Sequence, residues 1–260
     1  MRAISLMYHD ITEEADASGF AGADAALYKI PPSQFAKQIM LIAGNTKEQP
    51  LLVTEWKGGK TPIFITFDDG GGSAVNSADI LESQGWRGHF FITTGRIGSQ
   101  GFVSKNDIIE LHQRGHIVGS HSDSHPLRMA SLNREDILVE WHKSINKLED
   151  ILGEKVCVAS VPGGLYSREV AECAEANNIR FLFNSEPMTK VRQIGNCRIF
   201  GRYAVQIGME ADEIAAIASG KTTPRLKQYL LWNAKKPLKK LGGEGFLKLR
   251  TYLINRKAQN

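Results

Sequence analysis

Short apolar runs alternate with amphipathic segments along the first 205 residues of the chain. The apolar runs have the length of buried strands, and the segments between them repeat apolar positions at the helical period. The predicted strands span residues 3–8, 62–67, 89–93, 117–120, 156–161, 180–183 and 198–205. The predicted helices span residues 32–41, 73–84, 104–114, 133–152 and 168–177. This alternation predicts an α/β fold in which helices cover a parallel sheet.

Capping residues mark the ends of two of these helices. Ser104 precedes Asp107 by three positions, and Asn133 precedes Asp136 in the same way, as N-terminal caps do. Gly153 ends the second of these helices, because glycine readily takes the left-handed backbone that follows a helix. The two helices are therefore well delimited by the sequence.

Three chemically distinctive motifs follow directly on predicted strands. Asp68 and Asp69 end the second strand, His121 begins a loop that also carries His125, and residues 162–164 read Pro-Gly-Gly. In a barrel of parallel strands the active site lies at the carboxyl ends of the strands. We therefore expect the three motifs to meet at one rim.

The residue types at this rim predict a metal site. Two histidines four positions apart lie on one face of a helical turn, and histidine with carboxylate is a usual ligand set for a catalytic divalent metal. Successive strand residues point in opposite directions, so Asp68 and Asp69 need not share one task. One acid could bind the metal while its neighbour handles protons.

These motifs resemble those of the polysaccharide deacetylases, carbohydrate esterase family 4 with the NodB homology domain. Residues 66–70 read TFDDG, residues 121–125 read HSDSH, and residues 160–164 stand where the third motif of the family falls. The Tyr-His-Asp opening at residues 8–10 resembles the branch that acts on poly-N-acetylglucosamine and related glycans. The resemblance covers roughly residues 1–210. It implies an irregular (β/α)7 barrel and the removal of acetate from an acetylated sugar.

The resemblance also implies roles for the first two motifs. Asp68 would be the catalytic base, and Asp69, His121 and His125 would hold one divalent metal. Zinc suits these ligands, and nickel, cobalt or iron stay open with the same set. The metal would polarise the acetyl carbonyl and lower the pKa of a water molecule toward ~7.

The third motif is expected to line the substrate site. In the family a backbone N–H of this motif binds the oxyanion, and the matching position here is Gly163, between Pro162 and Gly164. Tyr166 and Phe102 lie in predicted rim loops, where an aromatic ring could stack on a sugar or simply pack.

The chain departs from the common family pattern at the general acid. Most members carry this acid as a histidine in a C-terminal motif, but no histidine follows His142 here. The branch with an N-terminal Tyr-His places an equivalent histidine at the start of the chain. His9 is therefore the candidate acid, with Asp10 orienting its ring, and a structural histidine is the alternative.

A second departure concerns the partner of the base. Ser160 stands where many members have an arginine that pairs with the catalytic aspartate. Arg202, in the last predicted strand, is our candidate to replace that charge, and we group it with the substrate-binding residues of the rim. An ordinary surface arginine is the alternative.

Charge separates the C-terminal forty residues from the rest. The net charge is +4, yet residues 221–260 hold eleven Lys or Arg and a single acid, which leaves −6 for residues 1–220. We expect residues 1–220 to form the barrel domain and residues 221–260 a basic tail of amphipathic helices, broken near Pro237 and at residues 242–243. The tail could pack on the barrel with a basic face outward, or lie on an anionic membrane surface. Nucleic acid is not an expected partner, because no binding module accompanies the charge.

The compartment is predicted from the start of the chain and its cysteines. The apolar run before His9 is too short for the core of a signal peptide, and no run reaches the roughly 20 apolar residues of a membrane span. Three cysteines, at positions 157, 173 and 197, give neither a disulfide framework nor a metal motif and are read as packing residues. We therefore expect a cytoplasmic protein, with peripheral contact at the inner face of the membrane as an option.

Taken together, the sequence predicts a metal-dependent N-deacetylase of an acetylated glycan or lipid-linked sugar in polysaccharide biosynthesis. A hydrolase acting on a non-sugar amide or cyclic amide is the first alternative, since fold and site do not fix the substrate. A non-catalytic glycan-binding relative is the second, and the intact Asp68, Asp69 and histidine pair weigh against it.

Overall fold

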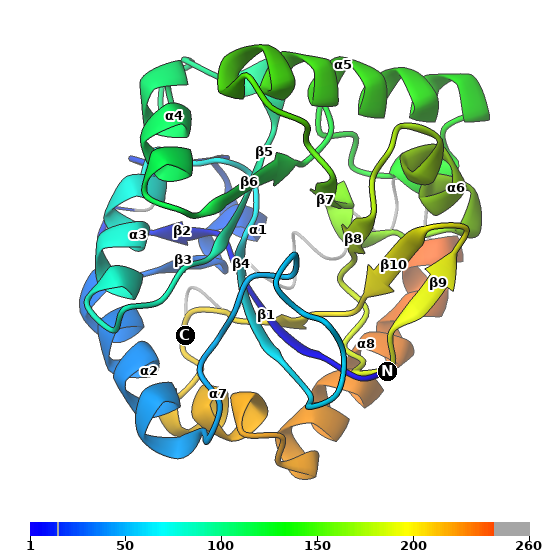
Figure 1. The fold of residues 1–260 in the computed structure, drawn as a ribbon. Coiled ribbons are helices and arrows are strands. Elements are labelled where there is room, and N and C mark those ends of the chain that lie inside the picture. Colours follow the sequence, from blue (N-terminus) through cyan, green and yellow to red (C-terminus); the bar gives the residue numbers. More distant parts are fainter. Residues whose placement is uncertain (15, 242–260) are drawn as a thin grey trace.

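A single curled sheet organises the protein, as seen in a computed structural model that describes residues 1–14 and 16–241 (Figure 1). Its nine strands, in spatial order, are β11 (Tyr203–Ala204), β1 (Ile4–Tyr8), β4 (Ile63–Phe67), β5 (His89–Ile92), β6 (Ile117–Ser120), β7 (Val158–Ser160), β8 (Phe181–Phe183), β10 (Cys197–Phe200) and β9 (Arg192–Ile194). Neighbouring strands are parallel except β9 and β10.

The sheet forms a half-barrel. From β1 to β10 the large parallel strands follow one another in chain order, so each crossover moves one strand along the sheet. The two edges approach at the amino ends of the strands, where the amide of Ala3 donates to the carbonyl of Thr189 at 2.9 Å. The predicted α/β barrel is thus confirmed as a curled, mainly parallel sheet.

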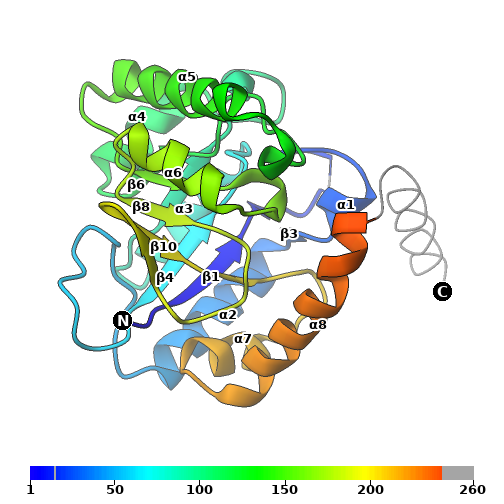
Figure 2. The same cartoon turned by 90° about the vertical axis from the view of Figure 1, so that its right-hand side faces the viewer.

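Helices cover the outer face of this sheet (Figures 1 and 2). They are α2 (Pro32–Asn45), α3 (Ala74–Glu82), α4 (Lys105–Gln113), α5 (Arg134–Leu152), α6 (Arg168–Ala176) and α7 (Ala211–Ala218). The predicted caps are present: Ser104 and Asp107 form a reciprocal capping box on α4, and Asn133 accepts from the amide of Asp136 on α5. Gly153 ends α5 with a φ of 71°.

One apolar cluster lies on each face of the sheet. The larger lies between the strands and the helices and includes Ile65 and Phe67 of β4. The smaller lies on the concave face and includes Phe64, Phe183 and Phe200, with 5.1 Å between the ring centroids of the last two. Because the strands are buried on both faces, they read as continuous apolar runs in the sequence.

The strand predicted over residues 198–205 is two strands in the structure. β10 pairs with β8, and β11 pairs with β1. The break falls at Gly201, where a Cβ atom would lie 2.3 Å from the carbonyl oxygen of Glu186. Only glycine fits this approach, and the turn directs the wholly buried side chain of Arg202 inward.

Several short elements were not predicted from the sequence. They are α1 (Ala23–Ala26), the two-stranded sheet of β2 (Asp10–Ile11) with β3 (Lys29–Ile30), and the strand β9 and helix α7 given above. β2 and β3 have two residues each, which is too short for a periodic signal. They nevertheless hold the segment after His9 against the barrel.

The final described helix, α8 (Thr222–Leu241), corrects one prediction about the tail. The expected break near Pro237 is wrong, because α8 continues through this position to Leu241. Residues 242–243 and the rest of the tail lie outside the described residues, and the domain boundary at residue 220 stays a prediction.

The first turns of α8 attach to the barrel through polar contacts. Gln228 donates to the carbonyl of Ala204 at 3.0 Å, whereas Leu226 and Leu230 are 49% and 58% exposed. The apolar residues at these two positions therefore do not pack on the barrel as one reading of the tail expected. Among the described helices, none is both long and apolar enough to cross a membrane.

Candidate functional site

Backbone pairing at the carboxyl ends of the strands brings the predicted motifs to one rim. Tyr8 of β1 stands opposite Phe67 of β4, and the amide of Asp68 donates to the carbonyl of Tyr8 at 3.0 Å. The amide of His121 donates to Ile92 at the end of β5 in the same way, at 2.9 Å. His9, Asp68 and His121 therefore each leave the sheet at the same level.

Asp69, His121 and His125 form a cluster that could hold a metal ion, with one donor atom of each within 4.8 Å of the others. The Nε2 atoms of His121 and His125 lie 3.4 and 3.3 Å from the same Oδ1 atom of Asp69. Two ligand atoms of one tetrahedral zinc ion, each about 2.0–2.1 Å from the ion, are about 3.3 Å from each other. The spacing and the donor types thus fit a divalent metal.

The backbone of this cluster is strained, and its shape corrects the predicted helical turn. Residues 121–125 form an irregular loop in which Ser122 and His125 have φ values of 62° and 59°. Asp69 also has a positive φ, 74°. Non-glycine residues rarely adopt this conformation, and such strain gathers at functional sites. Left-handed residues, not helical spacing, bring the two imidazoles together.

Hydrogen bonds from the surroundings hold this loop in place. The hydroxyl of Ser122 accepts from the amide of His125 at 3.1 Å, so Ser122 acts as a turn residue. The carboxylate of Glu140 on α5 accepts from the amides of Asp123 and Ser124 at 3.0 and 2.9 Å. Glu140 was not found from the sequence, because a lone acid on a long helix carries no local signal.

Asp68 is locked by Arg202. The guanidinium donates to both carboxylate oxygens, with Nη1–Oδ1 and Nη2–Oδ2 distances of 2.6 and 2.7 Å, and also to Thr66 and the carbonyl of Asn184. Burial alone would raise the pKa of Asp68, but the charges of Arg202 and His121 and the hydrogen bonds from Arg202 lower it below its ordinary value. Asp68 is therefore held ionised and in one orientation.

This geometry refines what was expected of Arg202. The side chain is wholly buried and its donors are directed to protein atoms, so we assign it to Asp68 and no longer to the substrate surface. The cation that pairs with Asp68 thus comes from the turn between β10 and β11 and not from within the strand that was predicted over residues 198–205.

Ser160 connects the base with the metal cluster, which the sequence did not suggest. Its hydroxyl donates to Oδ1 of Asp68 at 3.0 Å and lies 2.5 Å from Nδ1 of His121. The Nδ1 atom is also 3.1 Å from the carbonyl oxygen of Ser160. With Nδ1 engaged in this way, Nε2 of His121 is the ring nitrogen left for a metal.

Different side chains lower the pKa of Asp69 and of Asp68 most strongly, His121 in the first case and Arg202 in the second. Burial alone would raise its pKa, but hydrogen bonds from His121 and His125, together with the charge of His9, hold the pKa well below the usual range of an aspartate. The group is thus available as a carboxylate ligand over a wide pH range.

His9 directly follows β1 at the rim, and its charge contributes to lowering the pKa of Asp68 and of Asp69. Its ring packs on Tyr28 with 4.3 Å between centroids. Its buried Nδ1 atom has no hydrogen-bond partner within the described residues. The expected contact with Asp10 is wrong: Asp10 accepts instead from Ser18 and Ser73, because β2 directs it away to a buried polar cluster.

The third motif lies beside the histidine loop. Gly163 has a φ of 66°, and a Cβ atom there would lie 2.2 Å from the carbonyl oxygen of Leu127, which follows His125 by two residues. Pro162 is buried and Gly164 also has a positive φ, 71°. Glycine is therefore required at residue 163 for the two loops to touch.

The two aromatic candidates differ in their surroundings. Tyr166 is half-buried against the main apolar cluster, and burial raises the pKa of its hydroxyl. Phe102 packs edge to face on Phe20, whose ring lies 4.7 Å from that of His125. Phe20 is a residue that the sequence did not single out, since it lies in an irregular segment without periodicity.

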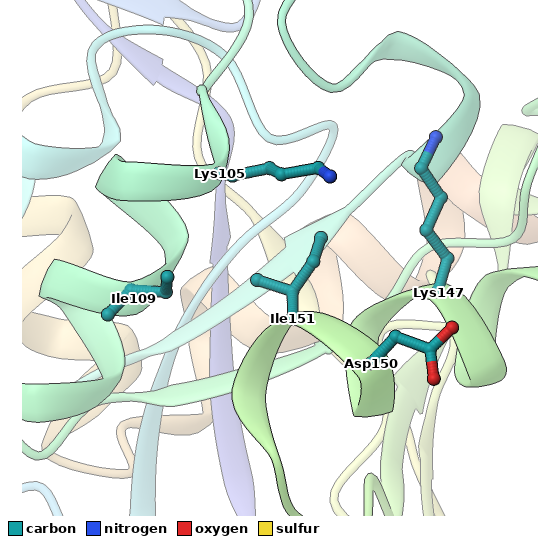
Figure 3. A pocket seen from close by; sticks show the side chains of 5 residues that line it. All are labelled: Lys105, Ile109, Lys147, Asp150 and Ile151. Atoms are coloured by element: carbon teal, nitrogen blue, oxygen red, sulfur yellow. The ribbon is translucent and has the colours of Figure 1, made fainter.

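A surface hollow elsewhere holds none of these residues. It has a volume of about 350 Å³ and lies between α4 and α5, lined by Lys105, Ile109, Lys147, Asp150 and Ile151 (Figure 3). Of its two lysines, Lys147 donates to the carbonyl of Thr94 at 2.7 Å. The candidate catalytic residues are therefore those of the Asp–His cluster and not those that line this hollow.

Comparison with known proteins agrees with this geometry. Residues 56–182, which contain all three motifs, match the family model of the polysaccharide deacetylases. The chain is 24% identical over 219 residues to YxkH of Bacillus subtilis, a protein assigned to the polysaccharide deacetylases, and the match covers 81% of this chain and 74% of YxkH.

Solved structures share the fold. A polysaccharide deacetylase from Bacillus cereus superposes with a TM-score of 0.70 at 20% identity, covering 84% of this chain and 69% of that one. IcaB from Ammonifex degensii gives 0.69 at 19% identity, covering 84% and 97%. The family model and the fold agree with the motifs at the rim. Residues 56–182 of this chain therefore match the polysaccharide deacetylase family, and the fold of the chain agrees with that match.

Proposed function

We propose that this protein is a metal-dependent hydrolase that removes the acetyl group from an N-acetylated sugar of a glycan or glycan precursor. The observation that carries the proposal is that the adjacent residues Asp68 and Asp69 have different partners. Asp68 is locked by Arg202 and directed into the barrel, and Asp69 faces His121 and His125. One acid is thus placed for proton transfer and its neighbour for metal binding.

Asp69, His121 and His125 would hold a divalent metal, for which zinc is our choice, and the metal would supply a Lewis acid for the acetamide carbonyl and lower the pKa of water toward neutral. Asp68 accepts the proton of the attacking water, and its contact with Arg202 keeps it ionised to do so. Ser160 holds Asp68 and His121 in register, so that base and metal ligand act on one substrate group.

His9 donates a proton to the leaving nitrogen in this mechanism. Support comes from its place at the rim and from its effect on both carboxylates. Gly163 contributes its backbone N–H to the oxyanion, a role taken from the family, with Pro162 and Gly164 shaping the loop.

We also propose a substrate class and a cellular location. The family supports an acetylated polysaccharide substrate, and we favour a sugar unit handled during polysaccharide biosynthesis in the cytoplasm. The exposed leucines of α8 and the basic composition of residues 221–260 favour peripheral contact with an anionic membrane, where a lipid-linked sugar would lie. A non-sugar amide stays the alternative substrate, because the cluster recognises the amide and not the sugar.

Acetate release tests this proposal. Metal-stripped and zinc-reconstituted protein are compared on N-acetylated oligosaccharides, lipid-linked sugars and a panel of simple amides and cyclic amides. We expect release from sugars only with metal. Turnover of an amide with none from any sugar would move the assignment to the alternative, and binding of sugars without any turnover would indicate a non-catalytic relative.

A further inference from the structure

An aromatic wall stands next to the metal cluster. It is formed by Phe20 and Phe102, whose ring centroids are 5.1 Å apart, and the ring of Phe20 contacts that of His125. Backbone bonds tie the two loops together: the amide of Gly19 donates to the carbonyl of Gly101 at 2.7 Å. The wall is therefore a fixed part of the rim.

Arg96 lies on this wall. Its Cζ atom is 5.5 Å from the ring centroid of Phe20 and 5.9 Å from that of Phe102. It ends the short helix η1 (Thr94–Arg96), whose Thr94 hydroxyl donates to Asp123 of the histidine loop at 2.8 Å. The position of Arg96 is thus coupled to the loop that carries the metal ligands.

The charge of Arg96 is not neutralised by the protein. The residue is exposed, and no ion pair joins it to a carboxylate in the part of the chain that the structure describes. A guanidinium resting on aromatic rings keeps its N–H edge free, and that edge matches the oxygens of a phosphate or carboxylate. The ring faces that the guanidinium covers are not available for stacking on a sugar.

The net charge of the residues around the rim would oppose an anionic ligand. Asp68 precedes the ligand Asp69, Asp123 lies between the two histidines, and residues 1–220 carry a net charge of −6. A negatively charged glycan would be repelled unless a local cation met it. We propose that Arg96, supported by Phe20 and Phe102, binds an anionic group, a phosphate or a carboxylate, on the acetylated glycan; this inference rests on the proposed function.

Three forms of one trisaccharide test the site: a trimer of N-acetylglucosamine, the same trimer carrying a 6-phosphate, and the trimer oxidised at C6 to the carboxylate. Acetate release is measured for wild type, Arg96→Gln and Arg96→Lys. Arg198→Gln is the matched control, because Arg198 also lies over an aromatic ring, 6.0 Å from Trp56, in the half of the barrel away from the rim. Binding of each trimer is measured by titration in a zinc-loaded Asp68→Asn background, with and without Arg96→Gln.

We expect the charged trimers to bind about tenfold more tightly than the neutral one, which is the scale of one charge-assisted hydrogen bond. Arg96→Gln should abolish the preference, Arg96→Lys should keep part of it, and Arg198→Gln should leave it intact. The favoured charged form identifies the anion as phosphate or carboxylate.

Equal binding of all three trimers, or a preference that survives Arg96→Gln, would overturn the site even if acetate is released. Binding that depends on Arg96 without acetate release from any trimer would support the site and contradict deacetylation. Neither binding nor release would overturn both.

Discussion

Removal of Arg202 gives the strongest test of how the base is held. Arg202→Met leaves the carboxylate of Asp68 buried at 4% exposure without its two guanidinium bonds. Breaking a buried ion pair by deleting one partner costs about 3–5 kcal/mol. For a chain of this size we therefore expect the midpoint of thermal unfolding to fall by about 6–20 °C.

A double-mutant cycle separates the charge from the packing. Adding Asp68→Asn to Arg202→Met removes the unpaired charge, so we expect about half of the lost stability to return, while the bonds of Arg202 to Thr66 and to the carbonyl of Asn184 stay lost. Lys60→Met is the control: its pair with Glu48 is 80% exposed on the lysine side and 46% on the glutamate side, and should contribute about 1 kcal/mol or less.

The same substitution should change the pH dependence of turnover. Without Arg202 the effect of burial dominates, so the pKa of Asp68 rises and the base protonates at higher pH. The acid limb of the pH–rate profile should therefore move to higher pH. Unchanged unfolding together with an unmoved acid limb would refute the assignment of Arg202 to Asp68.

Three further outcomes are expected. His9→Gln should lower kcat by about 10²–10⁴-fold with zinc content unchanged; an intact kcat would exclude His9 as the acid. Glu140→Ala should weaken zinc binding by about 10–100-fold through the loss of its bonds to the histidine loop, and zinc titration that matches wild type would contradict this. Burial lowers the pKa of His89 to about 4, so between about pH 6.5 and 4 the unfolded chain binds a proton at this residue and the folded chain does not. The free energy of unfolding should therefore fall by about 3 kcal/mol as the pH drops from 6.5 to 4. In urea unfolding, His89→Gln should reduce this dependence on pH.

The sequence predicted the large strands well because their burial on both faces makes them continuous apolar runs. β4 was expected at residues 62–67 and spans Ile63–Phe67, so the two acids after it were placed correctly at the rim. The helix caps at Ser104 and Asn133 were also predictable, since each depends on a residue only three positions away.

The contacts that complete the site were less predictable because they join distant segments. Ser160 was treated as the loss of an arginine, yet it bridges Asp68 and His121 across 92 and 39 positions of the chain. The converging histidines looked helical by spacing, whereas positive φ values at Ser122 and His125 produce the turn. Backbone strain of this kind has no signature in hydrophobic periodicity.

The most direct test of the account compares two adjacent substitutions, Asp68→Asn and Asp69→Asn, for zinc content and for acetate release from an N-acetylated oligosaccharide. The account predicts that Asp68→Asn keeps one zinc per chain and loses turnover, whereas Asp69→Asn loses the zinc as well. Equal loss of zinc in both variants, or turnover retained by Asp68→Asn, would contradict the division of base and metal ligand between the two residues.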